Sequence, residues 1–143
     1  MSLKNISTNT LKARHINIMT TMKSYTDLEQ SKKLVEILPI ESADMFYWCA
    51  DHYPKEDWII EVGPLDDDYE CICAWSLAAL LNIIPKKIKD FNVLRIDIGE
   101  STFAIWYDEI GYGVNRELPD IEMKEPVDAC VEMILKLKEK NQI

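Results

Sequence analysis

Residues 92–109 read NVLRIDIGESTFAIWYDE, and this stretch decides the fold. In its first seven residues, apolar side chains alternate with charged ones, which is the period-two pattern of a β-strand that buries one face. Gly99 and Glu100 supply a turn, and TFAIWYDE returns as a second strand. The pattern predicts a β-hairpin, which VNREL after Gly113 can extend into an antiparallel meander over residues 91–118.

The second hairpin strand distributes its aromatic residues over both faces of the predicted sheet. Phe103 and Tyr107 share one face, whereas Trp106 lies on the other. A large ring on the outer face of a sheet is often an interface anchor, although a covering loop or helix would explain it equally well. Candidate interface residues are aromatic or acidic side chains: Trp106, Tyr112, Asp66, Asp67 and Asp68.

The chain before the hairpin predicts mainly helix. Thr26 and Glu29 match a capping box at the start of a helix over residues 27–38, which Pro39 ends. Residues 42–48 suggest a short helical turn that leads Cys49 into a loop. This loop covers most of the chain up to Tyr69, apart from WIIEV, whose composition is typical of a strand.

Two further helices frame the hairpin in sequence. Ser76 is a suitable N-cap for residues 77–83, which are apolar nearly all round and are expected to be the most buried element. Pro126 occupies the first turn of a last helix. One apolar stripe runs along it: Val127, Cys130, Val131, Ile134 and Leu137.

Together these elements predict an α+β fold, with three to four helices packed on one face of a small antiparallel sheet. A length of 143 residues with 48% hydrophobic and 29% charged residues fits a single folded domain. We assign this domain to residues 22–143. Residues 1–21 show no apolar periodicity, and we interpret them as a flexible N-terminal extension.

The charge of the chain bears on its partners. The net charge is −9, and residues 1–22 carry three basic and no acidic side chains, which leaves 13 basic and 25 acidic residues, net −12, for the remainder. Such a surface disfavours nucleic acid and anionic membrane, because phosphate binding depends on Lys and Arg. The sequence shows no secretory signal and no apolar run long enough to span a bilayer, so we predict a cytoplasmic protein.

Thiols supply the only grouping that resembles a metal or catalytic site. Cys49, His52, Cys71 and Cys73 offer three sulfurs and an imidazole, but their spacing differs from that of structural zinc sites. We interpret the cysteines as buried, reduced thiols. Cys49 and His52 are close enough for a Cys–His pair, although no oxyanion site or orienting residue is evident. The acidic run at residues 66–70 does not match a calcium loop. We therefore predict no cofactor.

Three phrases accompany the hairpin: SKKLVEILPIESADM, WSLAALLNIIPKKI and DACVEMILKLKEKN. Together they resemble a set of short proteins of uncharacterised activity from gut Bacteroidetes, often associated with phage or other mobile elements. The resemblance covers nearly all of residues 22–143. It implies a mobile-element setting, and it implies no activity, cofactor or site residue.

Two classes of function follow from these observations. The first is a non-enzymatic protein-binding or regulatory module, because the domain has an acidic surface and candidate anchor aromatics but no catalytic constellation. The second is a small hydrolase or metal-dependent enzyme that uses Cys49, His52 and the acidic run at residues 66–70. The sequence leaves the identity of the protein partner and the oligomeric state open.

Overall fold

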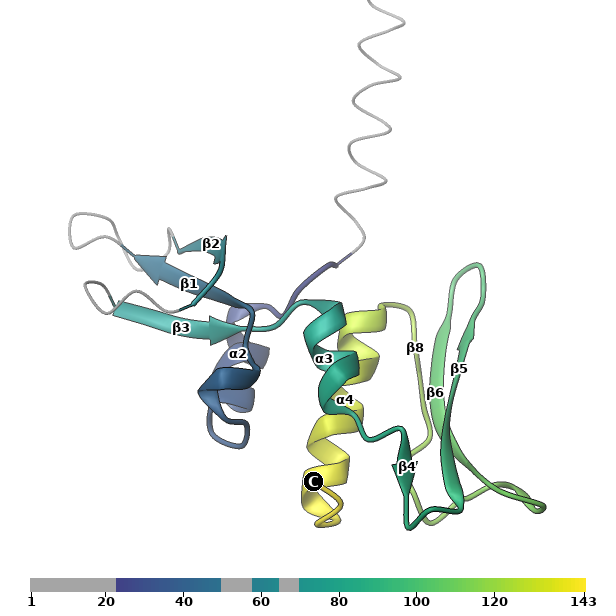
Figure 1. The fold of residues 1–143 in the computed structure, drawn as a ribbon. Coiled ribbons are helices and arrows are strands. Elements are labelled where there is room, and N and C mark those ends of the chain that lie inside the picture. Colours follow the sequence, from purple (N-terminus) through teal and green to yellow (C-terminus); the bar gives the residue numbers. More distant parts are fainter. Residues whose placement is uncertain (1–22, 50–57, 65–69) are drawn as a thin grey trace, which may run out of the picture.

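The computed structural model describes residues 23–49, 58–64 and 70–143. Within these residues the chain has an α+β fold with three α-helices and two antiparallel sheets, one of three strands and one of five (Figure 1). The predicted class is therefore confirmed, whereas the sequence pattern does not predict the second sheet. The proposed N-terminal extension lies outside the described residues. Among those described, every helix is too short or too polar to span a bilayer.

The five-stranded sheet is built around the predicted hairpin, which is confirmed. Its strands are β4 (Lys87–Ile88), β5 (Asn92–Ile98), β6 (Phe103–Glu109), β7 (Gly113–Val114) and β8 (Ile121–Met123). The order is β4-β5-β6-β7, and β8 also pairs with β6. The predicted third strand of the meander is reduced to β7, because the Asn115 side chain accepts a hydrogen bond from the Glu117 N–H (2.9 Å) and turns the chain.

The smaller sheet has the order β2-β1-β3. Its strands are β1 (Met45–Cys49), β2 (Ile59–Val62) and β3 (Glu70–Ala74). The strand predicted from WIIEV is confirmed as β2. The helical turn predicted over residues 42–48 is wrong, since only Ile40–Ser42 is helical and the following MFYWC is a strand. Aromatic residues such as Phe46 and Tyr47 fit a strand that is paired on both sides and half-buried.

The first helix is α2 (Leu28–Val35), and its capping box begins one residue later than the sequence suggests. Its capping box joins Asp27 and Gln30, so the predicted pairing of Thr26 with Glu29 is wrong. Thr26 is buried, and its hydroxyl hydrogen-bonds the Ser31 hydroxyl (2.8 Å) and accepts the Trp75 N–H (3.1 Å). It is therefore committed to the core and does not cap the helix.

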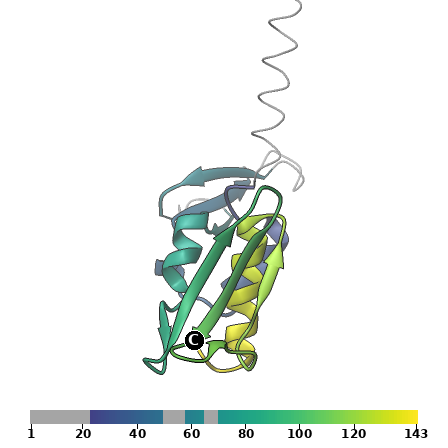
Figure 2. The same ribbon diagram turned by 90° about the vertical axis from the view of Figure 1, so that its right-hand side faces the viewer.

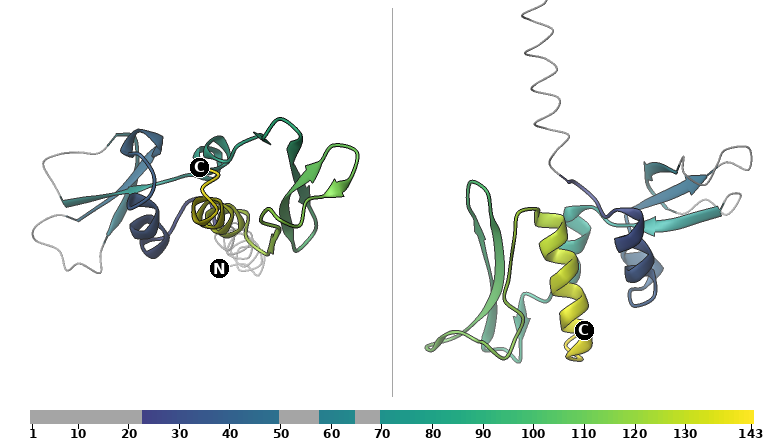
Figure 3. Two further views of the ribbon diagram at one scale, coloured as in Figure 1. Left: turned by 90° about the horizontal axis from the view of Figure 1, so that it is seen from below. Right: turned by 180° about the vertical axis from the view of Figure 1, so that it is seen from behind.

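The other helices, α3 (Leu77–Ile83) and α4 (Pro126–Glu139), agree with the prediction. Ser76 caps α3, its hydroxyl accepting the Ala79 N–H (3.2 Å), and Pro126 opens α4. Seen from below, these two helices lie between the two sheets, and α2 lies with the smaller one (Figure 3). Both helices cover the same face of the five-stranded sheet, and none of the described helices lies in front of its outer face (Figure 2).

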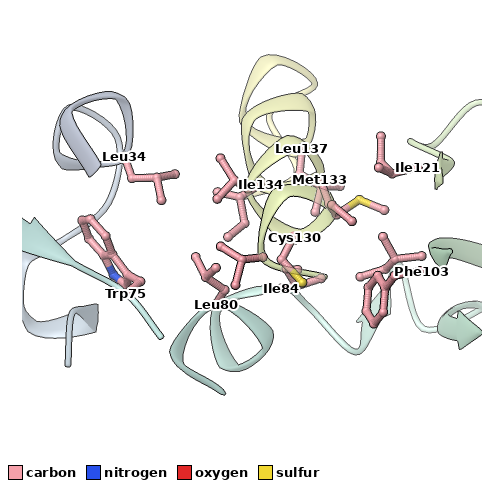
Figure 4. Packing of buried hydrophobic residues seen from close by; sticks show 14 of the residues in the cluster. Leu34, Trp75, Leu80, Ile84, Phe103, Ile121, Cys130, Met133, Ile134 and Leu137 are labelled. Carbon is pink, nitrogen blue, oxygen red and sulfur yellow. The ribbon is translucent and has the colours of Figure 1, made fainter. Parts of the chain in front are cut away.

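The core is one cluster that runs from Leu34 and Trp75 through the helices to Phe103 and Ile121 (Figure 4). Seven buried residues lie on α4, including the whole predicted stripe, whereas α3 contributes only Leu80. The expectation that residues 77–83 are the most buried element is wrong. Position explains the difference, because α4 packs against α2, α3, β6 and β8, while α3 packs chiefly against α4.

Candidate protein-binding edge

The outer edge of β5 has a free backbone in its C-terminal half. Along its whole length β5 pairs with β6, but on the other side β4 pairs only with Asn92 and Val93. One further bond, from the Leu94 N–H to the Lys86 carbonyl (2.9 Å), ends this ladder. Beyond Leu94, no described residue pairs with the outer edge of β5. The strand is therefore internal at its start and an edge strand at its end.

Two hydrogen bonds at the ends of the hairpin determine which backbone groups face this edge. The Ile110 N–H donates to the Phe91 carbonyl (2.8 Å), and the Gly99 N–H donates to the Thr102 carbonyl (2.8 Å). Backbone groups of successive residues in an antiparallel strand point to opposite sides. The odd-numbered residues of β5 therefore bond β6, and the N–H and C=O groups of Ile96 and Ile98 point outward.

The side chains of the same two isoleucines lie on the helix-facing side of the sheet. Their register partners on β6, Ile105 and Phe103, are buried there. Ile96 is nevertheless 41% exposed and Ile98 is 76% exposed. The reason is that α4 packs over β6 and β8, so the helices do not cover the end of β5. An apolar strip thus accompanies the open backbone.

A hollow of about 390 Å³ adjoins this strip on the side of α3. Its walls are apolar, with two cations at the end nearest β4: Leu81, Lys86, Lys87, Val93, Leu94 and Ile96. An open strand edge next to an apolar groove can accept an extended peptide, since the edge binds its main chain and the groove its side chains.

A larger hollow, of about 740 Å³, is polar. It is lined by the β4–β5 turn, by the loop after β7 and by residues that follow α4. Two of its side-chain amides, the buried Asn92 and the half-buried Asn115, bond within the protein, because Asn92 Nδ2 donates to the Ile88 carbonyl (3.1 Å) and Asn115 Nδ2 donates to Asn92 Oδ1 (2.8 Å). These contacts fix the loop after β7. No buried polar group among the described lining residues is left to bind a ligand.

The predicted interface residues lie in different places. Trp106 is on the outer face of the sheet, opposite in direction to Phe103 and Tyr107 as predicted, and its indole N–H donates to Asp108 (2.8 Å). Tyr112, 85% exposed, is in the turn between β6 and β7. The aspartates Asp66, Asp67 and Asp68 lie outside the described residues. An interface role for these five residues remains a prediction.

The cysteines of the proposed thiol site do not converge. Cross-strand pairing places Cys71 opposite Trp48 and Cys73 opposite Phe46, whereas Cys49 pairs with Glu70. Because facing residues share a side and neighbours alternate, Cys49 lies on the opposite face of the sheet from Cys71 and Cys73. The three sulfurs therefore cannot bind one metal ion in this fold. His52 lies outside the described residues, so a Cys49–His52 pair remains a prediction.

Burial raises the pKa of the Cys73 thiol, and it raises that of Cys130 to about 12. Both thiols are thus held in the protonated form, which is a poor nucleophile.

Cys130 makes the stability of the fold sensitive to alkaline pH. The native state holds the Cys130 proton more tightly than the unfolded chain does, so the contribution of this thiol to stability is fully present below about pH 9 and is lost as pH rises toward 12. We expect Cys130→Ala to abolish a loss of about 1.4 kcal/mol for each pH unit above 9. Urea unfolding of both proteins at pH 7, 9, 10 and 11 measures this, and parallel curves would contradict it.

The edge residues Ile96 and Ile98 are absent from the site residues that the sequence analysis predicts. Their alternation with Arg95 and Asp97 marks a strand but does not show whether that strand is paired on one side or two. Comparison with protein-family models, curated proteins and solved structures gave no match for this chain.

Proposed function

We propose that this chain is a non-enzymatic protein-binding module that takes up an extended segment of a partner protein as an additional strand along β5. The observation that carries the proposal is the outward direction of the N–H and C=O groups of Ile96 and Ile98, beside their exposed side chains. Strand addition is a common mode of peptide recognition, in which main-chain hydrogen bonds give affinity and alternate side chains give specificity.

The surroundings of the edge favour recognition over a purely structural role. Natural proteins usually shield exposed edges, for example with inward-pointing charges or proline. Here the inward positions hold two isoleucines, and the charged residues Arg95 and Asp97 lie on the outer face. A regulatory role, in the mobile-element setting that the resemblance implies, belongs to the same proposal, since a module without its own chemistry acts by occupying its partner.

Proline substitutions test the direction of the backbone groups. Ile98→Pro removes an N–H that bonds nothing within the described fold, so we expect the free energy of unfolding to change by less than about 1 kcal/mol. Asp97→Pro removes an N–H directed at Ala104 of β6 and should cost about 1–3 kcal/mol. Urea unfolding measures both. Equal losses would show that the edge has been assigned to the wrong residues.

A neutral strand-forming peptide then tests binding itself. We expect acetyl-Thr-Val-Thr-Val-Thr-amide to shift the backbone amide resonances of Ile96 and Ile98 with a dissociation constant on the order of 1 mM, since a few main-chain hydrogen bonds must offset the entropy of association. Ile98→Pro should abolish these shifts. Shifts confined to other residues, or shifts that persist in Ile98→Pro, would contradict strand addition at β5.

A further inference from the structure

We infer that the segment bound at β5 runs antiparallel to it and carries the four-residue pattern apolar, basic, apolar, acidic. This inference rests on the proposed function and specifies its partner. The pattern follows from the ladder register, from the two faces of β5 and from the charges along its edge.

The direction of the segment follows from β4 and from the charges at the two ends of the edge. β4 pairs antiparallel with β5, and an added strand in the same direction continues its line along the edge. Its last residue then approaches Lys86 and Lys87, while its first lies near Asp97 and Glu100. A strand that is basic early and acidic late matches these charges only in the antiparallel direction.

The register assigns each position of the segment. Lys87 pairs with Val93, and the Lys86 carbonyl accepts a hydrogen bond from the Leu94 N–H. The same register, continued along β5, leaves four positions for an added strand, opposite residues 95–98. The first and third residues face Ile98 and Ile96 and point into the apolar strip. The second and fourth lie on the outer face, opposite Asp97 and Arg95. A fifth residue has no place, because Lys86 already occupies it.

The two outer positions differ in how strongly they select. The Asp97 side chain makes no hydrogen bond or ion pair within the described part of the chain, so a basic residue opposite it gains a full partner. Arg95 already has an acidic partner in the protein, since its Nε lies 3.2 Å from Asp108 Oδ2, although its side chain is 56% exposed. The second position is therefore the main determinant of specificity.

A second copy of the chain is a poorer occupant of this edge. Pairing the outward groups of Ile96 with those of Ile98 of the other copy places the two Asp97 side chains directly opposite each other, which is destabilising. The register that would set Arg95 against Asp97 of the other copy requires the Leu94 N–H, which already donates to Lys86. Each chain also carries a net charge of −9.

Two peptides of identical composition test the inferred pattern. The forward peptide is acetyl-Thr-Val-Lys-Val-Glu-amide, which ends at the fourth place, and the reversed peptide exchanges its Lys and Glu. In amide titrations of the full chain, we expect the forward peptide to bind about tenfold more tightly, because exchange replaces two attractive cross-strand pairs with two repulsive ones. Asp97→Lys, at an exposed position, should remove most of this preference while the neutral peptide still binds.

Each outcome bears on the inference. A forward preference that Asp97→Lys removes supports it. Equal binding of both peptides at Ile96 and Ile98 overturns the charge pattern but leaves strand addition intact. If no peptide, including the neutral one, shifts these amides, the proposed function fails as well. Shifts of the same amides that depend on protein concentration without peptide would identify a second copy as the occupant and overturn the inference.

Discussion

Trp75→Ala should lower the free energy of unfolding by about 3–5 kcal/mol, the largest loss that we expect from any single substitution in this chain. The indole is fully buried and lies beside Leu34 where the smaller sheet meets the helices (Figure 4). Its N–H donates to the Ser42 hydroxyl (3.0 Å), and its backbone exchanges hydrogen bonds with Thr26. Removing the ring leaves a cavity and breaks the indole's hydrogen bond, while the Ser42 hydroxyl keeps its bond to the Pro39 carbonyl (2.6 Å), so the loss comes mainly from the cavity.

Trp75→Phe is the matched control, because it keeps an aromatic ring and loses the hydrogen bond to Ser42. We expect a loss of about half that of Trp75→Ala in urea unfolding, since most of the apolar burial is retained. If Trp75→Ala unfolds at the same denaturant concentration as the natural chain, the smaller sheet and α2 do not share one core with the helices.

The elements that the sequence predicts well are those whose pattern is local. The hairpin over residues 92–109 needs only alternation and a turn, and α4 needs only Pro126 and a stripe at helical spacing. In each case neighbouring residues carry the whole signal. The central hairpin of the five-stranded sheet and the helix α4 that packs on it could therefore be placed from periodicity alone.

The smaller sheet could not be predicted, because its central strand depends on residues far away in sequence. MFYWC in β1 has no alternation of polar and apolar residues, since its neighbours β2 and β3 and the adjoining elements bury parts of both faces. Such a short apolar run reads equally well as strand or helix. The prediction of the capping box failed for a similar reason, since the hydroxyl of Thr26 bonds the distant Trp75 and does not cap the helix that follows it.

The candidate edge shows the same limit. Leu94, Ile96 and Ile98 have one local pattern but three environments, from half-buried to largely exposed. What distinguishes them is the two-residue length of β4 and the place where α4 crosses the sheet. Neither is encoded within the strand. A binding edge of this kind is found from the hydrogen-bond register, since the sequence marks the strand and not its missing neighbour.

The position of α4 between the two sheets gives the second large prediction, a loss of about 2–4 kcal/mol for Ile134→Ala. Ile134 is fully buried and lies on the side of α4 that faces Leu34, while Met133 lies toward Ile121 (Figure 4). The substitution removes three carbon atoms from a packed site and leaves a void, and both effects act in the same direction. Alanine does not weaken the helix itself, so the loss reports packing alone.

Lys136→Ala is the matched control on the same helix. Its ammonium lies 3.7 Å from Glu132 in a half-exposed pair, so its removal should change the free energy of unfolding by less than about 0.5 kcal/mol. Urea unfolding at neutral pH compares the two variants. If Ile134→Ala overlays the natural chain, α4 does not join the two halves of the core. If both variants lose equally, the loss in Ile134→Ala does not come from burial of its side chain.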